Sequence, residues 1–199
     1  MTPSPFHLVS LGWGGDLIAG LLDRVEEHTG QQLSHILLTP LDRESLSDRP
    51  DRTSFHYLRE DIRAELPEPD LALLGSLEQP GVPTLHTMIL SDRAVRHLDY
   101  AEALKYATCL ARRLMELLET LRPSVVLGAF DGLHGAIAFA VARKLGIPWF
   151  AMQFSTVPKG LSCFCDGLTP DTDVTLSAPP VRERRASTVS YGPNRPKGP

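Results

Sequence analysis

The strongest constraint on the fold of this chain is an alternation of short apolar runs with amphipathic stretches. Residues 6–11 predict a strand, residues 17–25 carry apolar side chains at helical spacing, and residues 33–38 predict a second strand. The glycine-rich turn at 12–15 connects the first strand to the helix, which Asp16 can cap. A strand, a helix and a second strand in such a short length predict two parallel strands with a helical crossover.

The second half of the chain repeats this unit more clearly. Asp99 and Glu102 have the spacing of a capping box, and a long apolar face then predicts a helix that ends at Arg122–Pro123. Three further elements follow, namely a strand, a largely apolar helix and another strand, at residues 124–129, 133–145 and 147–154. The apolar runs do not alternate with polar residues, which is typical of strands covered on both faces. The sequence therefore predicts an α/β fold: a doubly wound, mostly parallel Rossmann-like sheet flanked by helices.

The region between these two units is less regular. Residues 42–70 are rich in acids and arginines, which predicts a solvent-facing excursion with one short helix around residues 55–65. Residues 71–74 predict a brief buried strand, whereas residues 84–90 fit either a strand or the start of a helix.

Composition divides the chain into a domain at residues 1–170 and a Pro-rich basic tail at residues 171–199, predicted to be disordered. Residues 179–199 contain five basic residues and one acidic residue, so this segment has a net charge of +4. Because the whole chain has a net charge of −4, residues 1–178 have a net charge of −8. An acidic domain is a poor match for a phosphate backbone, so we expect no nucleic-acid partner. Three cysteines give no even disulfide framework, which favours the cytoplasm, and no charge-free run is long enough for a transmembrane segment.

In an open parallel sheet, ligands bind at the carboxyl ends of the strands. The first loop at such an end contains three glycines that let a ligand approach the backbone, followed by a carboxylate: Gly12, Gly14, Gly15 and Asp16. It is neither a complete dinucleotide fingerprint nor a P-loop. The alternative is a tight turn in which Asp16 only caps the helix.

Two further loops carry candidate side chains. Asp131 and His134 place a carboxylate and an imidazole at a helix start, and histidine is well suited to proton transfer near neutral pH. The alternative is an aspartate cap beside a packed histidine. Phe154 and Ser155 offer a ring and a hydroxyl that suit a sugar, unless they form an ordinary loop. Cys163-Phe164-Cys165 lacks a second ligand pair, so we predict no metal site there.

Several of these segments together resemble the N-terminal half of bacterial surface- and capsule-polysaccharide proteins, over roughly residues 6–170. The matching stretches are residues 85–93, 98–100, 122–128, 130–134 and 140–148. Such proteins are similar to GT-B glycosyltransferases and to sugar-nucleotide 2-epimerases of the same two-domain plan. The loop after the first strand also resembles the Gly-Gly-x-Gly-Gly-His loop of peptidoglycan-forming N-acetylglucosaminyltransferases, with Asp16 in the place of the histidine.

The resemblance implies that this chain binds a sugar or glycan acceptor, while a C-terminal half binds the nucleotide-sugar donor. Asp16 or His134 would be the catalytic base, and the substrate-binding residues would be Gly12, Gly14, Gly15, Asp131, Phe154 and Ser155. No cofactor is expected in this chain, because the nucleotide-sugar belongs to the missing half. Too few residues follow Pro170 for that half, so we expect a truncated product or one half of a split enzyme, completed by a separate donor-binding domain.

Whether the chain alone is an enzyme is left open by the sequence. Transfer requires both reactants in one oriented site, which a single half does not provide. The alternative function is a non-catalytic binding or assembly module of a polysaccharide-synthesis system. A nucleotide-dependent oxidoreductase is disfavoured by the incomplete dinucleotide fingerprint.

Overall fold

The computed structural model describes residues 6–11, 24–25, 27–28, 33–40, 53–61, 63–128, 132–154 and 162–165. Within these ranges six strands form one sheet in the order β3-β2-β1-β4-β5-β6. The strands are β1 (Leu8–Leu11), β2 (Leu33–Leu37), β3 (Thr53–Tyr57), β4 (Val125–Gly128), β5 (Trp149–Phe154) and β6 (Ser162–Cys165). The first five run parallel, and β6 pairs antiparallel with β5.

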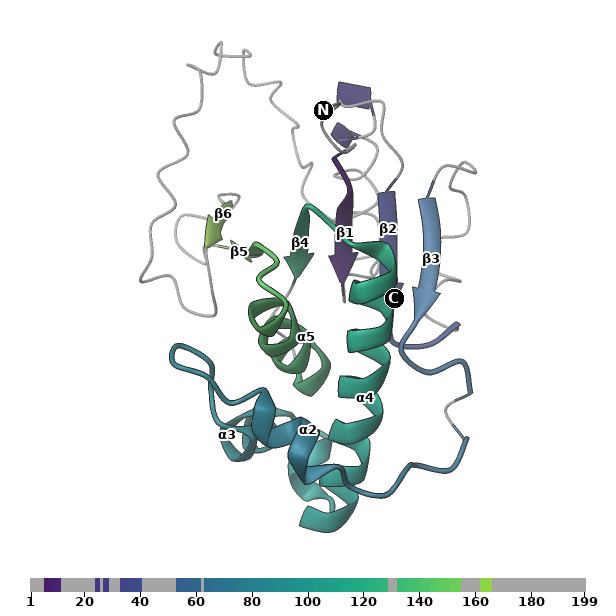
Figure 1. Cartoon of the computed structure of the whole chain (residues 1–199), viewed down its shortest axis with the longest axis vertical. Helices are drawn as coiled ribbons and strands as arrows, with labels where there is room; N and C mark the ends of the chain where they lie inside the picture. The colour runs from purple at the N-terminus through teal and green to yellow at the C-terminus, as the bar shows by residue number, and fades with distance from the viewer. Residues whose placement is uncertain are drawn as a thin grey trace, which may run out of the picture.

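The strand order confirms the predicted doubly wound, mostly parallel Rossmann-like sheet. From β1 the chain moves outward to β2 and β3, then returns to the other side of β1 and continues to β4 and β5 (Figure 1). Because β1 pairs with both β2 and β4, the direction of winding reverses at the β1–β4 boundary.

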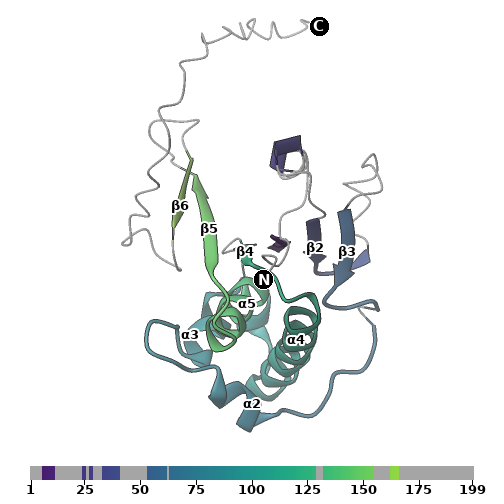
Figure 2. The ribbon, with the colours of Figure 1, turned by 45° about the horizontal axis from the view of Figure 1, so that its top comes forward.

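Helices cover both faces of the sheet. The helices of one face are α2 (Leu71–Ser76), α3 (Leu85–Ser91), α4 (Tyr100–Leu121) and α5 (Leu133–Lys144), with the 3₁₀ helix η2 (Val95–His97) between α3 and α4. Figure 2 shows α2 to α5 gathered on the same side of the strands. On the opposite face Val25, in a helical segment, packs against side chains of β1, β2 and β4. This cover on both faces explains why every residue of β1, β2 and β4 is buried.

The main core lies between the sheet and the two long helices. The amphipathic helix α4 buries one face, including Leu110 and Leu114, against a cluster that contains Val9 and Val126. It ends as predicted, since Arg122 adopts a left-handed conformation (φ +46°) and Pro123 follows. In contrast, α5 is buried almost all round because it packs against α3, α4 and the sheet.

Two predictions for the middle of the chain are wrong. Residues 71–74 form the helix α2 rather than a strand, because the Asp70 carboxylate accepts the Leu73 N–H at 2.9 Å and caps a helical turn. The region predicted as a short helix at residues 55–65 contains β3 instead, which pairs with β2 along its whole length. Short apolar runs fit both states, so pairing and capping partners decided between them.

Two helix starts add detail to the prediction. The open alternative at residues 84–90 resolves as α3, capped by the Thr84 hydroxyl, which accepts the Thr87 N–H at 3.3 Å. Asp99 does occupy the N-cap position of α4, but its side chain makes no capping hydrogen bond. The predicted tail at residues 171–199, and with it the domain boundary, lies outside the described residues. No helix in the described ranges combines the length and the apolar character needed to cross a membrane.

Candidate functional site

The carboxyl ends of β1 and β4 lie side by side at the reversal of the sheet. Ser10 pairs in register with Leu127, so Leu11 and Gly128 end their strands next to each other. On the far side of β4, Gly128 pairs with Ala151 of the parallel strand β5. The three strands that precede the predicted loops therefore all end at the same edge of the sheet. Open α/β sheets bind ligands at such a reversal point.

The described residues include only part of the predicted site. His134 lies in the first turn of α5, and the backbone of Phe154 ends β5. The other predicted residues lie outside the described ranges: Gly12, Gly14, Gly15, Asp16, Asp131 and Ser155. Among the described residues, the start of α5 is therefore the part of the predicted site with a defined side-chain geometry.

The start of α5 depends on a glycine. Gly132 is the N-cap and has a φ of +104°, a conformation that residues with a side chain rarely adopt. A Cβ there would lie 2.8 Å from Oδ2 of Asp92 and 3.4 Å from Nδ1 of His134. Because Gly132 has no side chain, a small space remains there, and the carboxylate of Asp92 and the imidazole of His134 both border it.

Asp92, at the end of α3, supplies the cap that Gly132 lacks. Its Oδ2 accepts the N–H of Leu133, the first residue of α5, at 2.7 Å. Its Oδ1 accepts the N–H groups of Ala94 and Val95 at 2.9 and 2.8 Å. One carboxylate therefore fixes the start of η2 and the start of α5 together.

The electrostatics of this cluster follow from these bonds. Burial raises the pKa of Asp92, but the N–H groups of Val95, Leu133 and Ala94 and the nearby His134 more than offset it, so the pKa lies below its ordinary value of 3.8. Asp92 is therefore ionised at neutral pH, and His134 is half-buried within its field. The arrangement can stabilise positive charge on the imidazole when it takes up a proton.

Sequence reasoning missed Asp92 as part of the site. The residue stands in the stretch that carries the family resemblance, and an aspartate before a short helical turn is a local capping signal. No local pattern, however, indicates that its second oxygen reaches Leu133, which is 41 positions further along the chain.

A second histidine lies inside the sheet. Ser10 and His35 are fully buried on neighbouring strands, and the Ser10 hydroxyl hydrogen-bonds with Nδ1 of His35. The ring of Phe55 on β3 meets the His35 ring edge-on, with centroids 6.2 Å apart. Because Ser10 and His35 are fully buried, we assign this row to joining β1, β2 and β3 rather than to binding a ligand.

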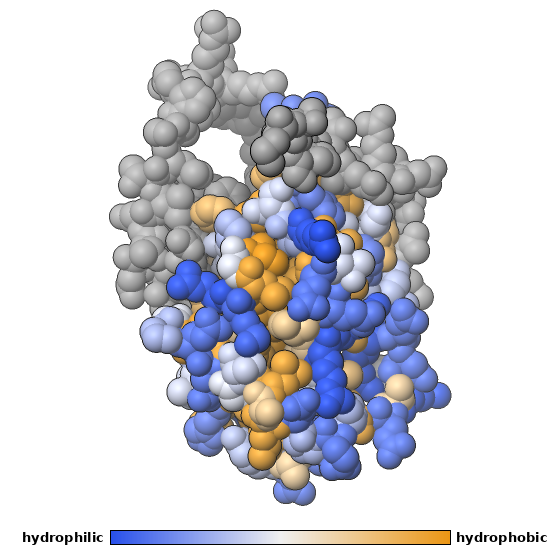
Figure 3. Space-filling model, viewed as in Figure 1, coloured by the Kyte–Doolittle hydropathy of each residue, from blue (hydrophilic) through white to orange (hydrophobic). Residues whose placement is uncertain are grey.

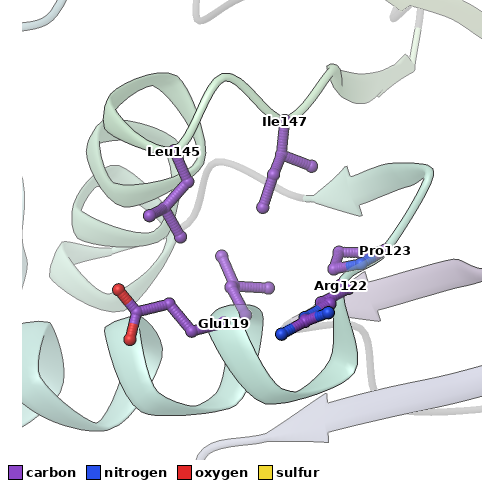
Figure 4. A pocket seen from close by; sticks show the side chains of 6 residues that line it. Glu119, Arg122, Pro123, Leu145 and Ile147 are labelled. Atoms are coloured by element: carbon purple, nitrogen blue, oxygen red, sulfur yellow. The ribbon is translucent and has the colours of Figure 1, made fainter.

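A hollow lies at the opposite, amino edge of the sheet. It has a volume of about 540 Å³ and is lined by residues from the ends of α4 and α5 and the following turns: Leu118, Glu119, Arg122, Pro123, Leu145 and Ile147 (Figure 4). Figure 3 shows apolar surface framed by polar side chains on this face of the molecule. The hollow faces away from the reversal point and contains none of the predicted site residues, so it is a separate feature of the surface.

Comparisons with known proteins give structural neighbours only. No protein-family model matches the chain, and no curated protein matches it. Among solved structures it is similar to UDP-GlcNAc 2-epimerase from Neisseria meningitidis (14% identity, TM-score 0.41, covering 77% of this chain and 34% of that one). It is also similar to MurG from Acinetobacter baumannii (20% identity, TM-score 0.43, covering 74% of this chain and 34% of that one).

A third neighbour shows how general this likeness is. The C-terminal domain of a hydrogenase from Pyrococcus furiosus matches with 13% identity and a TM-score of 0.40, over 75% of this chain and 96% of that one. Proteins of different activity thus score alike, so the strand order and not these scores establishes the fold. The chain spans about a third of the length of the epimerase and MurG chains.

Proposed function

We propose that this chain is the acceptor-side half of a glycosyltransferase-like enzyme of bacterial surface-polysaccharide synthesis in the cytoplasm. One observation carries the proposal. β1 and β4 pair in parallel at the reversal of the sheet, and these are the strands that precede the glycine-rich loop at 12–15 and the loop that begins α5, so both strands end at the same edge. Small residues and an imidazole beside a fixed carboxylate suit a sugar hydroxyl that has to lose a proton.

The proposed reaction uses a nucleotide-sugar as donor. His134 or Asp16 takes the proton of the acceptor hydroxyl, whose oxygen forms a bond to the anomeric carbon. The bond from that carbon to the phosphate oxygen breaks, and the nucleoside diphosphate leaves with the electron pair. In this scheme the three glycines of the first loop let the acceptor approach the backbone, whereas Asp131, Phe154 and Ser155 contact its ring and hydroxyls.

The donor belongs to a second half, which is either a following domain or a separate protein. Binding both reactants in one cleft would then complete the enzyme.

A titration with N-acetylglucosamine and with UDP-GlcNAc, followed by backbone amide NMR, tests the acceptor role. We expect the sugar to shift the amide signals of Gly132, Leu133 and His134, and His134→Ala to weaken its binding about tenfold. His97→Ala is the matched control, because His97 is an exposed histidine on η2. Shifts confined to the hollow around Ile147, or equal effects of both variants, would contradict the proposal.

Turnover is tested by adding a donor-binding half in trans and measuring release of UDP. Asp16→Asn and His134→Ala distinguish the two candidate bases, because the variant that removes the base should lower the rate at least a hundredfold. If neither variant slows transfer, the assignment of the base is wrong.

A non-catalytic binding or assembly module is the second candidate. Leu90, Leu98 and Tyr100, which flank Asp92 in the sequence, expose 53%, 49% and 51% of their surface. Exposed apolar side chains favour contact with a partner protein where they join into one continuous patch. A stable complex with a partner protein, without any sugar transfer, would favour this candidate over the first.

A further inference from the structure

We propose that Asp92 is the positioning residue for His134: its carboxylate fixes the start of α5 and stabilises the imidazole of His134 when it is protonated. This inference rests on the proposed function, in which His134 takes the proton of the acceptor hydroxyl. Asp92 itself touches no substrate in this scheme and acts through the helix and the imidazole.

The first step is the capping bond. The N–H of Leu133 has no partner within its own helix, and Gly132 has no side chain to cap it. Leu133 is fully buried, so water is a poor substitute. The Oδ2 of Asp92 accepts this N–H at 2.7 Å, which ties the turn that carries His134 to the end of α3.

The second step is that the carboxylate is rigid. The N–H groups of Ala94 and Val95 hold its other oxygen at 2.9 and 2.8 Å, and both residues belong to the turn that follows Asp92. A carboxylate with both oxygens bonded to backbone does not rotate freely, so its negative charge stays at one place relative to α5.

The third step is the approach of the imidazole. Oδ2 of Asp92 and Nδ1 of His134 lie 2.8 and 3.4 Å from the position that a Cβ on Gly132 would occupy, so both border the space the glycine leaves empty. The attraction between the two groups lowers the pKa of Asp92. By reciprocity the same attraction favours the protonated form of His134. It thereby counteracts the positive end of the helix dipole, which disfavours a positive charge at the start of α5.

Two reciprocal titrations of the full-length chain test this coupling without any ligand. In Asp92→Asn, we expect the titration midpoint of the His134 ring protons to fall by about one pH unit. In His134→Gln, which leaves every capping bond of Asp92 in place, the midpoint of the Asp92 carboxyl ¹³C signal should rise by the same amount. Asp99→Asn is the matched control, because Asp99 is an exposed aspartate whose side chain caps nothing.

A purely structural role for Asp92 predicts a different result. Asp92→Asn would then lower the melting temperature and leave the His134 midpoint where Asp99→Asn leaves it, and that outcome overturns the inference. If Asp92→Asn does not fold, the second titration decides alone: an unchanged Asp92 midpoint in His134→Gln overturns the proposal. If Asp92 and His134 titrate together but no sugar binds, the proposed function is contradicted and the positioning role stands. If sugar binds but the two residues titrate independently, the positioning role is contradicted and the proposed function stands.

Discussion

The two edges of the parallel sheet join helices to strands by different chemistry. At the amino edge His7, which precedes β1, hydrogen-bonds through Nδ1 to the carbonyl oxygen of Leu121 and through Nε2 to the hydroxyl of Ser34, both at 2.9 Å. The backbone N–H of His7 also donates to the Ser124 hydroxyl. Backbone and hydroxyl groups of the fold therefore use both ring nitrogens of this histidine.

At the carboxyl edge a charged side chain, the carboxylate of Asp92, joins the helices instead. Asp92 binds three backbone N–H groups and lies near a second histidine, His134, whose helix begins at a glycine. The comparison teaches that a histidine with both nitrogens occupied serves the fold. A histidine beside a fixed carboxylate at a sheet reversal is the better candidate for moving a proton.

The largest expected effect comes from the glycine that ends β4. A Cβ on Gly128 would overlap the indole ring of Trp149, which is buried and packs edge-on against Phe139. Gly128→Ala should therefore lower the free energy of unfolding by about 3 kcal/mol, measured by urea denaturation.

Gly75→Ala is the control for that substitution. Gly75 lies in α2, and no atom lies within 4 Å of the place that an alanine Cβ would take there, so alanine should stabilise the chain by up to about 1 kcal/mol. Equal unfolding midpoints for Gly128→Ala and the wild type would mean that the carboxyl edge is not packed as described.

The next effect separates the cap of α5 from an ordinary surface aspartate. Asp92→Ala removes the partner of three backbone N–H groups, so we expect a loss of about 2 kcal/mol in the free energy of unfolding. Asp99→Ala should change it by less than about 0.5 kcal/mol, because the side chain of Asp99 makes no capping bond. Similar losses in both variants would remove the distinction between the two aspartates.

The amino edge should be less sensitive. His7→Ala removes two side-chain hydrogen bonds and should lower the free energy of unfolding by about 1 kcal/mol without changing sugar binding. His97→Ala is the control in thermal denaturation, because His97 is an exposed histidine on η2. Loss of sugar binding in His7→Ala would show that the two edges are not separate in function.

The smallest effect is a dependence on acid. Because the pKa of Asp92 in the folded chain lies below its ordinary value of 3.8, its contribution to stability is complete above that pH. It is lost as the pH falls through the lower, folded value. Urea midpoints should therefore fall less steeply with pH below 3.8 in Asp92→Asn than in the wild type, and parallel curves would contradict this.

Another group adds to acid sensitivity at higher pH. Burial, Arg113 and His7 lower the pKa of His56, so the folded chain resists its protonation and loses stability as the pH falls below 6.5. Comparing the wild type with Asp92→Asn cancels this contribution, since His56 is present in both.

The sequence predicted the long and strongly periodic elements well. The helix α4 and the strands β4 and β5 lie where apolar periodicity, Pro123 and Gly146 indicate. The short elements were harder, because α2 and β3 each span only a few residues and their apolar patterns fit either state. Of the candidate site, the sequence singled out His134 but not its neighbour Asp92.

By itself the sequence determined the doubly wound α/β plan, because long apolar runs and helical periodicity can be recognised within a single segment without knowing its neighbours in the fold. Only the tertiary structure decided that β3 pairs with β2, that β6 runs antiparallel, and that Asp92 caps α5. These features depend on contacts between residues far apart in the chain. No short stretch of sequence encodes such contacts, because the two partners interact only after folding has brought them together.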